Sequence, residues 1–217
     1  MDRLELNDDQ RKRLRIFEAL LKKWSKIKNL VAASTLDQVW ERHILDSVQV
    51  QRCVPDARIW LDIGSGAGFP GLVTAILLAE HPNSLVHLVE SDNRKCAFLR
   101  DVSRETGIKT LVHPRRIEAV LPTLSGVDAV SARALAPLPQ LVDWCHGLLL
   151  SGTIGVFPKG REASSELTRL AQDSKFSFTL KPSLTHADGT IVIVRNRDSG
   201  DSGALRDECR DESSGSG

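Results

Sequence analysis

The hydrophobic pattern of the chain changes character near residue 57. Before that point, apolar residues recur every three or four positions, as on one face of an amphipathic helix. Over residues 7–31 this spacing predicts a helix with a basic opposite face, and Asn7 is its expected N-cap. A second helix is predicted over 36–53 and is closed by Pro55. We therefore expect residues 1–56 to form an N-terminal helical cap.

From residue 57 onward, short apolar runs alternate with amphipathic segments. Strands are predicted over 59–63, 85–90, 109–113, 128–132 and 153–157. Helices are predicted over 70–80, 93–106, 138–150 and 162–173, with a short segment over 115–121. This alternation is typical of an α/β domain with a doubly wound, mostly parallel sheet, here spanning 57–197. Two final strands, 176–181 and 190–195, have no helix between them and are expected to pair at one edge of the sheet.

Composition adds few constraints on this picture. The 217 residues are 41% hydrophobic and 26% charged, as in ordinary globular proteins. Residues 198–217 are acidic and rich in Ser and Gly, which predicts a disordered tail. Met1–Glu5 lacks the start of a signal peptide and no apolar run approaches a membrane span, so we expect a cytoplasmic protein without membrane association. The four scattered cysteines predict neither a metal site nor a disulfide framework.

Charge is distributed unevenly along the chain. The net charge is only +1, yet residues 11–28 contain eight Lys and Arg and one acid, Glu18. A helix face of this density would attract a phosphate backbone. A solvated helix face explains the same pattern equally well. The charge alone leaves both interpretations open.

A glycine-rich turn follows the first strand predicted in the α/β part. Gly66-x-Gly68-x-x-Gly71 fits the dinucleotide pattern, so a dehydrogenase is one candidate. Asp62, however, places an anion where a pyrophosphate would lie, and Pro70 removes an N–H from the start of the next helix. The glycines at 64, 66 and 68 also form a looser turn. S-adenosylmethionine, which has a positive centre and an ammonium group, fits these features better.

Each part of such a ligand has an expected partner. Asp62 would counter its ammonium group, directly or through water, while the glycine backbone approaches its carboxylate. Glu90, which ends the second strand of the α/β part, would accept hydrogen bonds from both ribose hydroxyls. The adenine would lie near Ile117 and Glu118, after the third strand of that part.

Four motifs resemble those of one family. They are Asp62-x-Gly64-Ser65-Gly66-Ala67-Gly68-Phe69-Pro70-Gly71, Glu41-Arg42-His43-Ile44-Leu45-Asp46-Ser47, Ser131-Ala132-Arg133-Ala134 and Pro158-Lys159-Gly160. Together they resemble the bacterial RsmG (GidB) methyltransferases, over about residues 30–162. The glycine turn alone would indicate only a class I S-adenosylmethionine-dependent methyltransferase with a Rossmann-like sheet.

The resemblance implies both a site and a reaction. The implied cofactor residues are Gly64, Phe69, Ile117, Glu118 and Arg133, with Asp62, Gly66, Gly68 and Glu90 as expected for the class. The implied substrate is the N7 atom of a guanine in the decoding-region loop of 16S ribosomal RNA, within the small ribosomal subunit. A monomer is expected. The alternatives are a small-molecule methyltransferase on the same fold and a non-catalytic nucleotide- or RNA-binding module.

The proposed chemistry is compatible with the residues available. Guanine N7 carries a free lone pair, so its methylation needs positioning rather than a general base or a catalytic cysteine. No Pro-Cys pair is present, and Ser131-Ala132-Arg133-Ala134 stands where amino-group methyltransferases carry Asn/Asp-Pro-Pro-Tyr/Phe. Arg133 is the predicted catalytic residue, holding guanine O6 or the edge of the cofactor. Its alternative role is a salt bridge to Asp128 or Asp143.

Two further groups of polar residues remain ambiguous from sequence. Arg42, His43 and Asp46 share a helical spacing and would cover the cofactor, bind RNA, or join the helices to the sheet. Lys159 and Arg161 follow the fifth strand of the α/β part and would contact RNA phosphates or belong to a solvated loop. No metal ligand set is predicted.

Overall fold

A single mixed sheet organises the protein. The computed structural model describes residues 5–25, 30, 38–170 and 175–198. Seven strands follow the order β3-β2-β1-β4-β5-β7-β6. They are β1 (Ile59–Ile63), β2 (Leu85–Val89), β3 (Thr110–His113), β4 (Ala129–Ser131), β5 (Ile154–Lys159), β6 (Phe176–Pro182) and β7 (Thr190–Asn196). The first five pair in parallel, whereas β7 runs antiparallel between β5 and β6, which confirms the predicted fold class and the predicted final strand pair.

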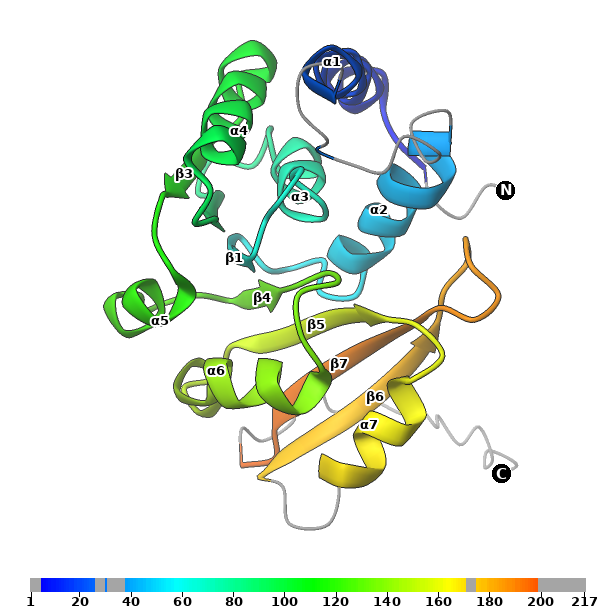
Figure 1. Cartoon of the computed structure of the whole chain (residues 1–217), viewed down its shortest axis with the longest axis vertical. Helices are drawn as coiled ribbons and strands as arrows, with labels where there is room; N and C mark the ends of the chain where they lie inside the picture. The colour runs from blue at the N-terminus through cyan, green and yellow to red at the C-terminus, as the bar shows by residue number, and fades with distance from the viewer. Residues whose placement is uncertain (1–4, 26–29, 31–37, 171–174, 199–217) are drawn as a thin grey trace, which may run out of the picture.

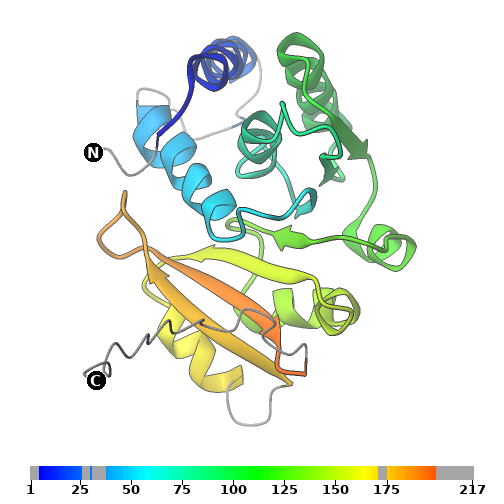
Figure 2. The same cartoon turned by 180° about the vertical axis from the view of Figure 1, so that it is seen from behind.

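Helices cover both faces of this sheet (Figures 1 and 2). They are α1 (Asp8–Ser25), a π-helical turn (Trp40–Ile44), α2 (Leu45–Arg52), α3 (Gly71–Leu77), α4 (Asn93–Thr106), α5 (Ile117–Val120) with a 3₁₀ turn (Leu121–Thr123), α6 (Leu138–Leu150) and α7 (Ala163–Leu170). The alternation along β1 divides the core between the two faces. Trp60 packs with the α1–α4 side, and Leu61 and Ile63 pack with the α6 side.

Local signals in the sequence explain the ends of α4. The Asp92 carboxylate caps the helix by accepting hydrogen bonds from the amides of Arg94 (2.7 Å) and Lys95 (3.2 Å). Gly107 ends it with a φ of +65°, a left-handed conformation that glycine adopts without steric cost. The helix therefore occupies the residues that its sequence predicts.

The predicted second helix is only partly correct. Its described part begins with a π-helical turn, Trp40–Ile44, and becomes α-helical only from Leu45. Apolar spacing does not distinguish a π turn from an α turn within five residues. Residues 26–29 and 31–37, residues 171–174 and the predicted tail from 199 lie outside the described residues.

The N-terminal helices share a core with the sheet. Phe17 of α1 is fully buried, and its ring centroid lies 5.0 Å from that of Phe69 and 6.2 Å from that of Phe98. Arg13 donates to the backbone carbonyl of Thr106 at the end of α4. This shared core contains residues from both sides of the predicted boundary at residue 56. The division into two domains there stays a prediction.

Membrane-spanning helices and metal-binding clusters are both absent from the described residues. None of their helices is long and apolar enough to cross a membrane. Within the same ranges, no group of three or more His, Cys, Asp or Glu side chains is arranged to hold a metal ion.

Replacing Phe17 with alanine should destabilise the protein. The buried ring packs between Phe69 and Phe98, so we expect a loss of about 3–5 kcal/mol in the free energy of unfolding. Urea denaturation followed by circular dichroism measures this. Ile16→Ala on the same helix is the control, because Ile16 is only half-buried. Equal losses for the two variants would contradict the shared core.

Candidate cofactor and substrate site

Three cavities lie along the carboxyl ends of the parallel strands, where β1 meets β4 and the strand order reverses. A cavity of about 610 Å³, here called the ribose cavity, is lined by Leu30, Gly64, Gly66, Val89, Glu90, Ser91, Lys95, Arg115, Arg116, Ile117, Glu118, Arg133, Ala134, Leu135 and Trp144. The turn cavity, of about 320 Å³, is lined by Leu30, His43, Gly64, Ser65, Gly66, Ala67, Phe69, Arg133 and Ala134.

The third cavity opens on the other side of β4. This outer cavity, of about 370 Å³, is lined by Arg42, His43, Asp46, Arg133, Ala134, Pro158, Lys159, Gly160, Ser183, Thr185, His186, Gly189, Thr190 and Ile191. Arg133 and Ala134 line all three cavities and form a ridge between them. Ala134 has a φ of +53°, which is rare for a residue with a side chain.

The glycines of the turn have different roles. A Cβ on Gly66 would meet only the carbonyl of Gly64, at 3.7 Å, so this backbone is open to a ligand. A Cβ on Gly68 would lie 2.3 Å from Cδ1 of Leu72, so Gly68 lets α3 pack against the turn. Gly68 lines none of the three cavities, and its role as a cofactor contact stays a prediction. Gly64 lines two of them, with a φ of +66°.

Asp62 lies beneath the glycine turn rather than in a cavity. Its Oδ1 accepts a hydrogen bond from the Ser131 hydroxyl at 2.8 Å, while Oδ2 has no hydrogen-bond partner among the described residues. Only 1% of the residue is exposed. Burial raises the pKa of Asp62 to about 6, although Ser131, Ser65 and the Gly71 amide oppose the shift. Asp62 is therefore not placed to contact a ligand directly. A contact with the ammonium group through water remains the alternative.

Glu90 is held with its carboxylate at the edge of the ribose cavity. One oxygen accepts from the amide of Gly66 at 3.0 Å and the other from the amide of Asp92 at 2.8 Å. A carboxylate oxygen has a further lone pair for a ligand hydroxyl, so this fixation leaves capacity for the predicted ribose contact.

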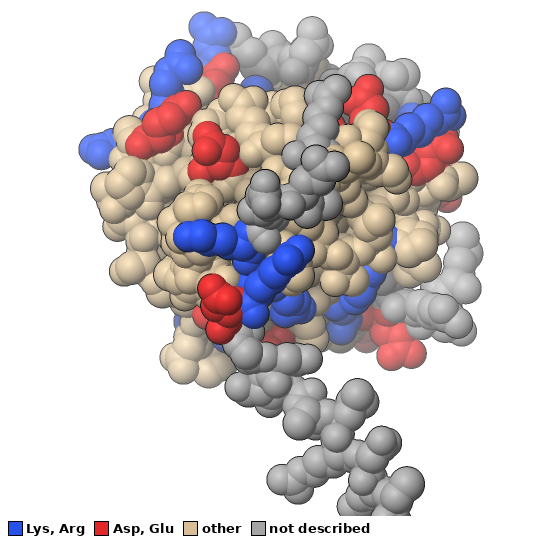
Figure 3. All heavy atoms as spheres, turned by 90° about the horizontal axis from the view of Figure 1, so that it is seen from below, with Lys and Arg blue, Asp and Glu red and all other residues tan. Residues whose placement is uncertain are grey.

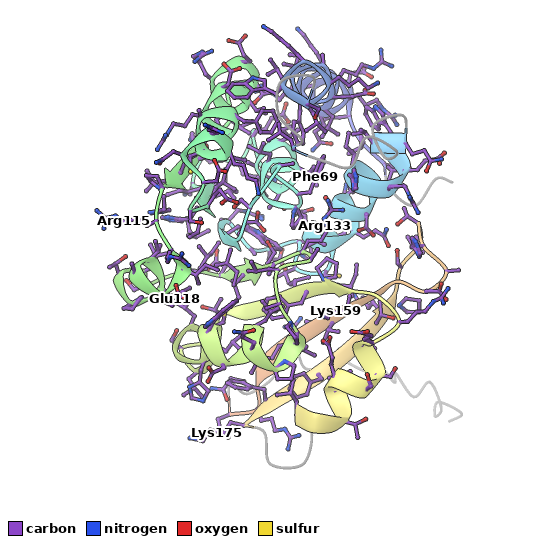
Figure 4. All side chains as sticks on the ribbon, viewed as in Figure 1. Phe69, Arg115, Glu118, Arg133, Lys159 and Lys175 are labelled. Atoms are coloured by element: carbon purple, nitrogen blue, oxygen red, sulfur yellow. The ribbon has the colours of Figure 1, made fainter. Side chains whose placement is uncertain are left out.

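Ile117 and Glu118 also line the ribose cavity, at the start of α5. Figure 4 shows Glu118 and Arg115 on the side of the molecule away from Lys159. Sequence reasoning missed several lining residues, namely Leu30, Val89, Ser91, Lys95, Arg115, Leu135 and Trp144. In the sequence, Leu30, Leu135 and Trp144 resemble ordinary apolar core residues. Only the folded structure shows that they line the cavity.

Arg133 is anchored to the N-terminal helical region. Its Nη1 lies 2.9 Å from Nδ1 of His43, 3.4 Å from the carbonyl oxygen of Arg42 and 3.9 Å from Oδ2 of Asp46. Its guanidinium carbon lies 5.1 Å from the centroid of the Phe69 ring (Figure 4). The alternative salt bridge to Asp128 or Asp143 is absent among the described residues, where the ion pair of Arg133 is with Asp46. Asp128 Oδ2 instead accepts the amides of Arg58 and Ile59.

Asp46 and His43 have structural contacts that the sequence left open. Oδ1 of Asp46 lies 3.3 Å from the hydroxyl of Ser183 and 3.1 Å from that of Thr185, so it holds the β6–β7 loop. The His43 ring packs against Phe69, with centroids 5.1 Å apart and ring planes tilted by 33°. Burial and the charge of Arg133 lower the pKa of His43 to about 4, so the ring is neutral at pH 7. Of the three suggested roles, joining the helices to the sheet is the one these contacts display.

Lys159 and Arg161 differ in burial and in their ion-pair partners. The Lys159 ammonium is largely buried and pairs with Glu166 at 2.9 Å, and it also donates to the carbonyl of Ala136 at 3.1 Å. It therefore joins β5 to α7, and a contact with RNA phosphate stays a prediction. Arg161 is 82% exposed and pairs with Asp188 at 2.6 Å, a surface arrangement that a phosphate can replace.

The basic stretch of the sequence falls on the outer side of α1. Arg11, Lys12, Arg15, Lys22 and Lys23 are exposed there, whereas Lys26 and Lys28 lie outside the described residues. On the face seen from below in Figure 3, Lys and Arg side chains lie beside Asp and Glu. The three cysteines within the described ranges are buried, and burial raises the pKa of Cys145 to about 12, which makes it a poor nucleophile.

Comparison with known proteins identifies the fold and then the family. A solved structure of a methyltransferase from Geobacter sulfurreducens is similar, with a TM-score of 0.60, 10% sequence identity and coverage of 83% of this chain and 88% of that chain. The fold is that of a class I methyltransferase. The family model described as rRNA small subunit methyltransferase G matches residues 10–191. The chain belongs to this family, which confirms the resemblance found in the motifs.

Similar sequences cover most of the chain. The ribosomal RNA small subunit methyltransferase G of Methylorubrum extorquens (strain PA1) is 50% identical over 181 residues, 83% of this chain and 86% of that protein. The protein of the same name from Rhizobium meliloti (strain 1021) is 43% identical over 196 residues, 89% of this chain and 92% of that protein.

Alanine at the two glycines should separate binding from folding. Gly66→Ala places a methyl group in open space at a φ of +54°, so we expect roughly 1 kcal/mol of destabilisation and weaker S-adenosylmethionine binding. Gly68→Ala also collides with Leu72 and should destabilise more. Calorimetric titration and thermal unfolding measure both effects. Unchanged affinity in Gly66→Ala would show that this backbone does not face the ligand.

Asp62→Asn should change the pH dependence of stability. A raised pKa means that the folded state retains a proton which the unfolded state releases, so stability falls as pH rises from about 4 through about 6. The difference between an ordinary value near 3.8 and about 6 corresponds to about 3 kcal/mol. The variant lacks this decline and should be at least as stable as the wild type at pH 8, yet bind S-adenosylmethionine more weakly. Parallel stability profiles of the two proteins from pH 4 to 8 would refute the assignment.

Proposed function

We propose that the protein transfers the methyl group of S-adenosylmethionine to N7 of a guanine in 16S ribosomal RNA. Family membership supports the RNA substrate and the reaction. The structural observation that carries the proposal is the ridge formed by Arg133 and Ala134, which lines every one of the three cavities. A base in the outer cavity and a cofactor in the other two would meet across two residues.

The residues present fit the cofactor. The open backbone at Gly66 accommodates close approach, and the fixed Glu90 carboxylate retains acceptor capacity for a ribose. Asp62 keeps one oxygen without a hydrogen-bond partner among the described residues, as expected of a carboxylate that counters a cationic ligand through water. Gly64, Gly66, Phe69, Glu90, Ile117, Glu118 and Arg133 would hold the cofactor.

Methyl transfer to guanine N7 requires little from the protein beyond positioning the base and the cofactor. S-adenosylmethionine supplies a methyl group that is already electrophilic. Arg133 directs its guanidinium at guanine O6, which leaves the adjacent N7 lone pair free to attack. His43 is neutral at pH 7 and so adds no second positive charge beside that guanidinium. No side chain needs to remove a proton, because N7 is unprotonated in the neutral base.

The context of the substrate belongs to the same proposal. We infer that a monomer acts on the RNA within the small subunit, in the bacterial cytoplasm. The exposed cations of α1, together with Arg42 and Arg161, would contact phosphates electrostatically. A small-molecule methyltransferase and a non-catalytic module are less well supported, because the related proteins are named as rRNA methyltransferases.

Methyl transfer to unmodified small subunits tests the function. Labelled S-adenosylmethionine is supplied with intact subunits, with naked 16S RNA and with small molecules, and the modified base is mapped. We expect 7-methylguanine at one position of the RNA. Labelling of small molecules alone would overturn the proposal.

Arg133→Ala should abolish transfer while the protein stays folded. The guanidinium lies at the ridge between the cavities, so its removal takes away the group that orients the base. We expect at least a hundredfold loss in kcat, with thermal unfolding monitored in parallel. Arg161→Ala, at the exposed pair with Asp188, is the control and should mainly raise KM. A fully active Arg133→Ala variant would contradict the role.

A further inference from the structure

The contacts of Arg133 are concentrated on one nitrogen of its guanidinium. Nη1 faces Nδ1 of His43, the carbonyl oxygen of Arg42 and the carboxylate of Asp46. The recorded hydrogen bonds among the described residues give no partner to its Nε or Nη2. One end of the group is therefore fixed to the N-terminal helical region, and the other end carries the donors that remain for a ligand.

The anchoring groups come from the π-helical turn. His43 and Arg42 are adjacent residues of this turn, which closes with the amide of Leu45 bonded to the carbonyl of Trp40. The turn directs a side-chain nitrogen from one residue and a backbone carbonyl from the other to the same guanidinium nitrogen. Single π turns in helices are frequent at functional sites.

The hydrogen bond also fixes the state of the imidazole. A guanidinium only donates, so Nδ1 of His43 must be the acceptor at 2.9 Å, and the ring proton lies on Nε2. Protonation of Nδ1 would replace this bond with repulsion between two cations. The low pKa of His43, caused by burial and by Arg133, is consistent with this tautomer.

A ring stack holds the anchor in place. The His43 ring packs on Phe69, with centroids 5.1 Å apart, and the Arg133 guanidinium lies over the same ring. Phe69 is itself 4% exposed and packs against Phe17 of α1. Asp46 contributes charge at the longer distance of 3.9 Å, while its Oδ1 is engaged with the β6–β7 loop.

We propose that His43 is a positioning residue: its Nδ1 fixes Nη1 of Arg133, so that Nε and Nη2 face the cavities. His43 thus acts through Arg133, whereas the sequence left open whether it covers the cofactor, binds RNA or joins the helices to the sheet. The consequence for methyl transfer rests on the proposed function. The anchoring itself does not, and a measurement on the free protein tests it.

Two amide substitutions separate the anchor from simple packing. In His43→Asn, the side-chain oxygen takes the place of Nδ1, whereas in His43→Gln the amide takes the place of Nε2. Both lose the aromatic stack on Phe69, so their thermal stabilities should be similar. We expect His43→Asn to keep kcat within about fivefold of the wild type and His43→Gln to lose at least thirtyfold. Equal activity of the two variants would overturn the proposal.

A nitrogen-15 NMR spectrum of the free protein gives a readout without turnover. An anchored Nη1 slows rotation of the guanidinium, so wild type and His43→Asn should show separate Nη1 and Nη2 signals for Arg133, assigned by their absence in Arg133→Lys. His43→Gln should show one averaged signal. Averaged signals in the wild type would refute the anchor. If the spectra follow the expectation but wild-type protein methylates no RNA, the proposed function fails while the anchor stands.

Discussion

The arrangement of the site depends on one buried hydrogen bond, from the Ser131 hydroxyl to the Asp62 carboxylate. It joins β1 to β4 where the strand order reverses, and Asp62 and Ser131 are register partners in that pair. The carboxylate also limits what can follow, because a Cβ on Gly71 would lie 2.6 Å from its Oδ2. The start of α3, the glycine turn above it and the ridge after β4 are therefore placed by the same buried acid. Its burial with one carboxylate oxygen left without a hydrogen-bond partner among the described residues is a cost to stability.

Much of the fold follows from local sequence. β1, α4 and α6 have the residues predicted for them, because their apolar periodicity and end signals agree with the final packing. The glycine turn, Glu90 and Arg133 were likewise located correctly at the carboxyl ends of strands. These positions depend on chain order within a known type of sheet, which sequence patterns specify well.

Other features depend on contacts between distant segments, and sequence patterns do not specify them. Lys159 looked like a free cation, but its partner Glu166 lies on a helix whose approach to β5 is decided by the fold. Gly68 looked like a ligand contact, and only the position of Leu72 shows its packing role. The link between His43 and Arg133 spans 90 residues and requires a π turn, for which the hydrophobic spacing carries no signal.

The ridge of Arg133 and Ala134 has a consequence for inhibition. Its residues line cavities on both sides, so the proposed cofactor space and the proposed base space share these two residues. A single molecule that crosses the ridge would contact both spaces and lose its translational freedom only once. Molecules of this kind need two recognition elements joined by a short connection past Ala134, the smaller of the two ridge residues. Compounds confined to the ribose cavity would instead rely on recognition features that are common among methyltransferases of this class.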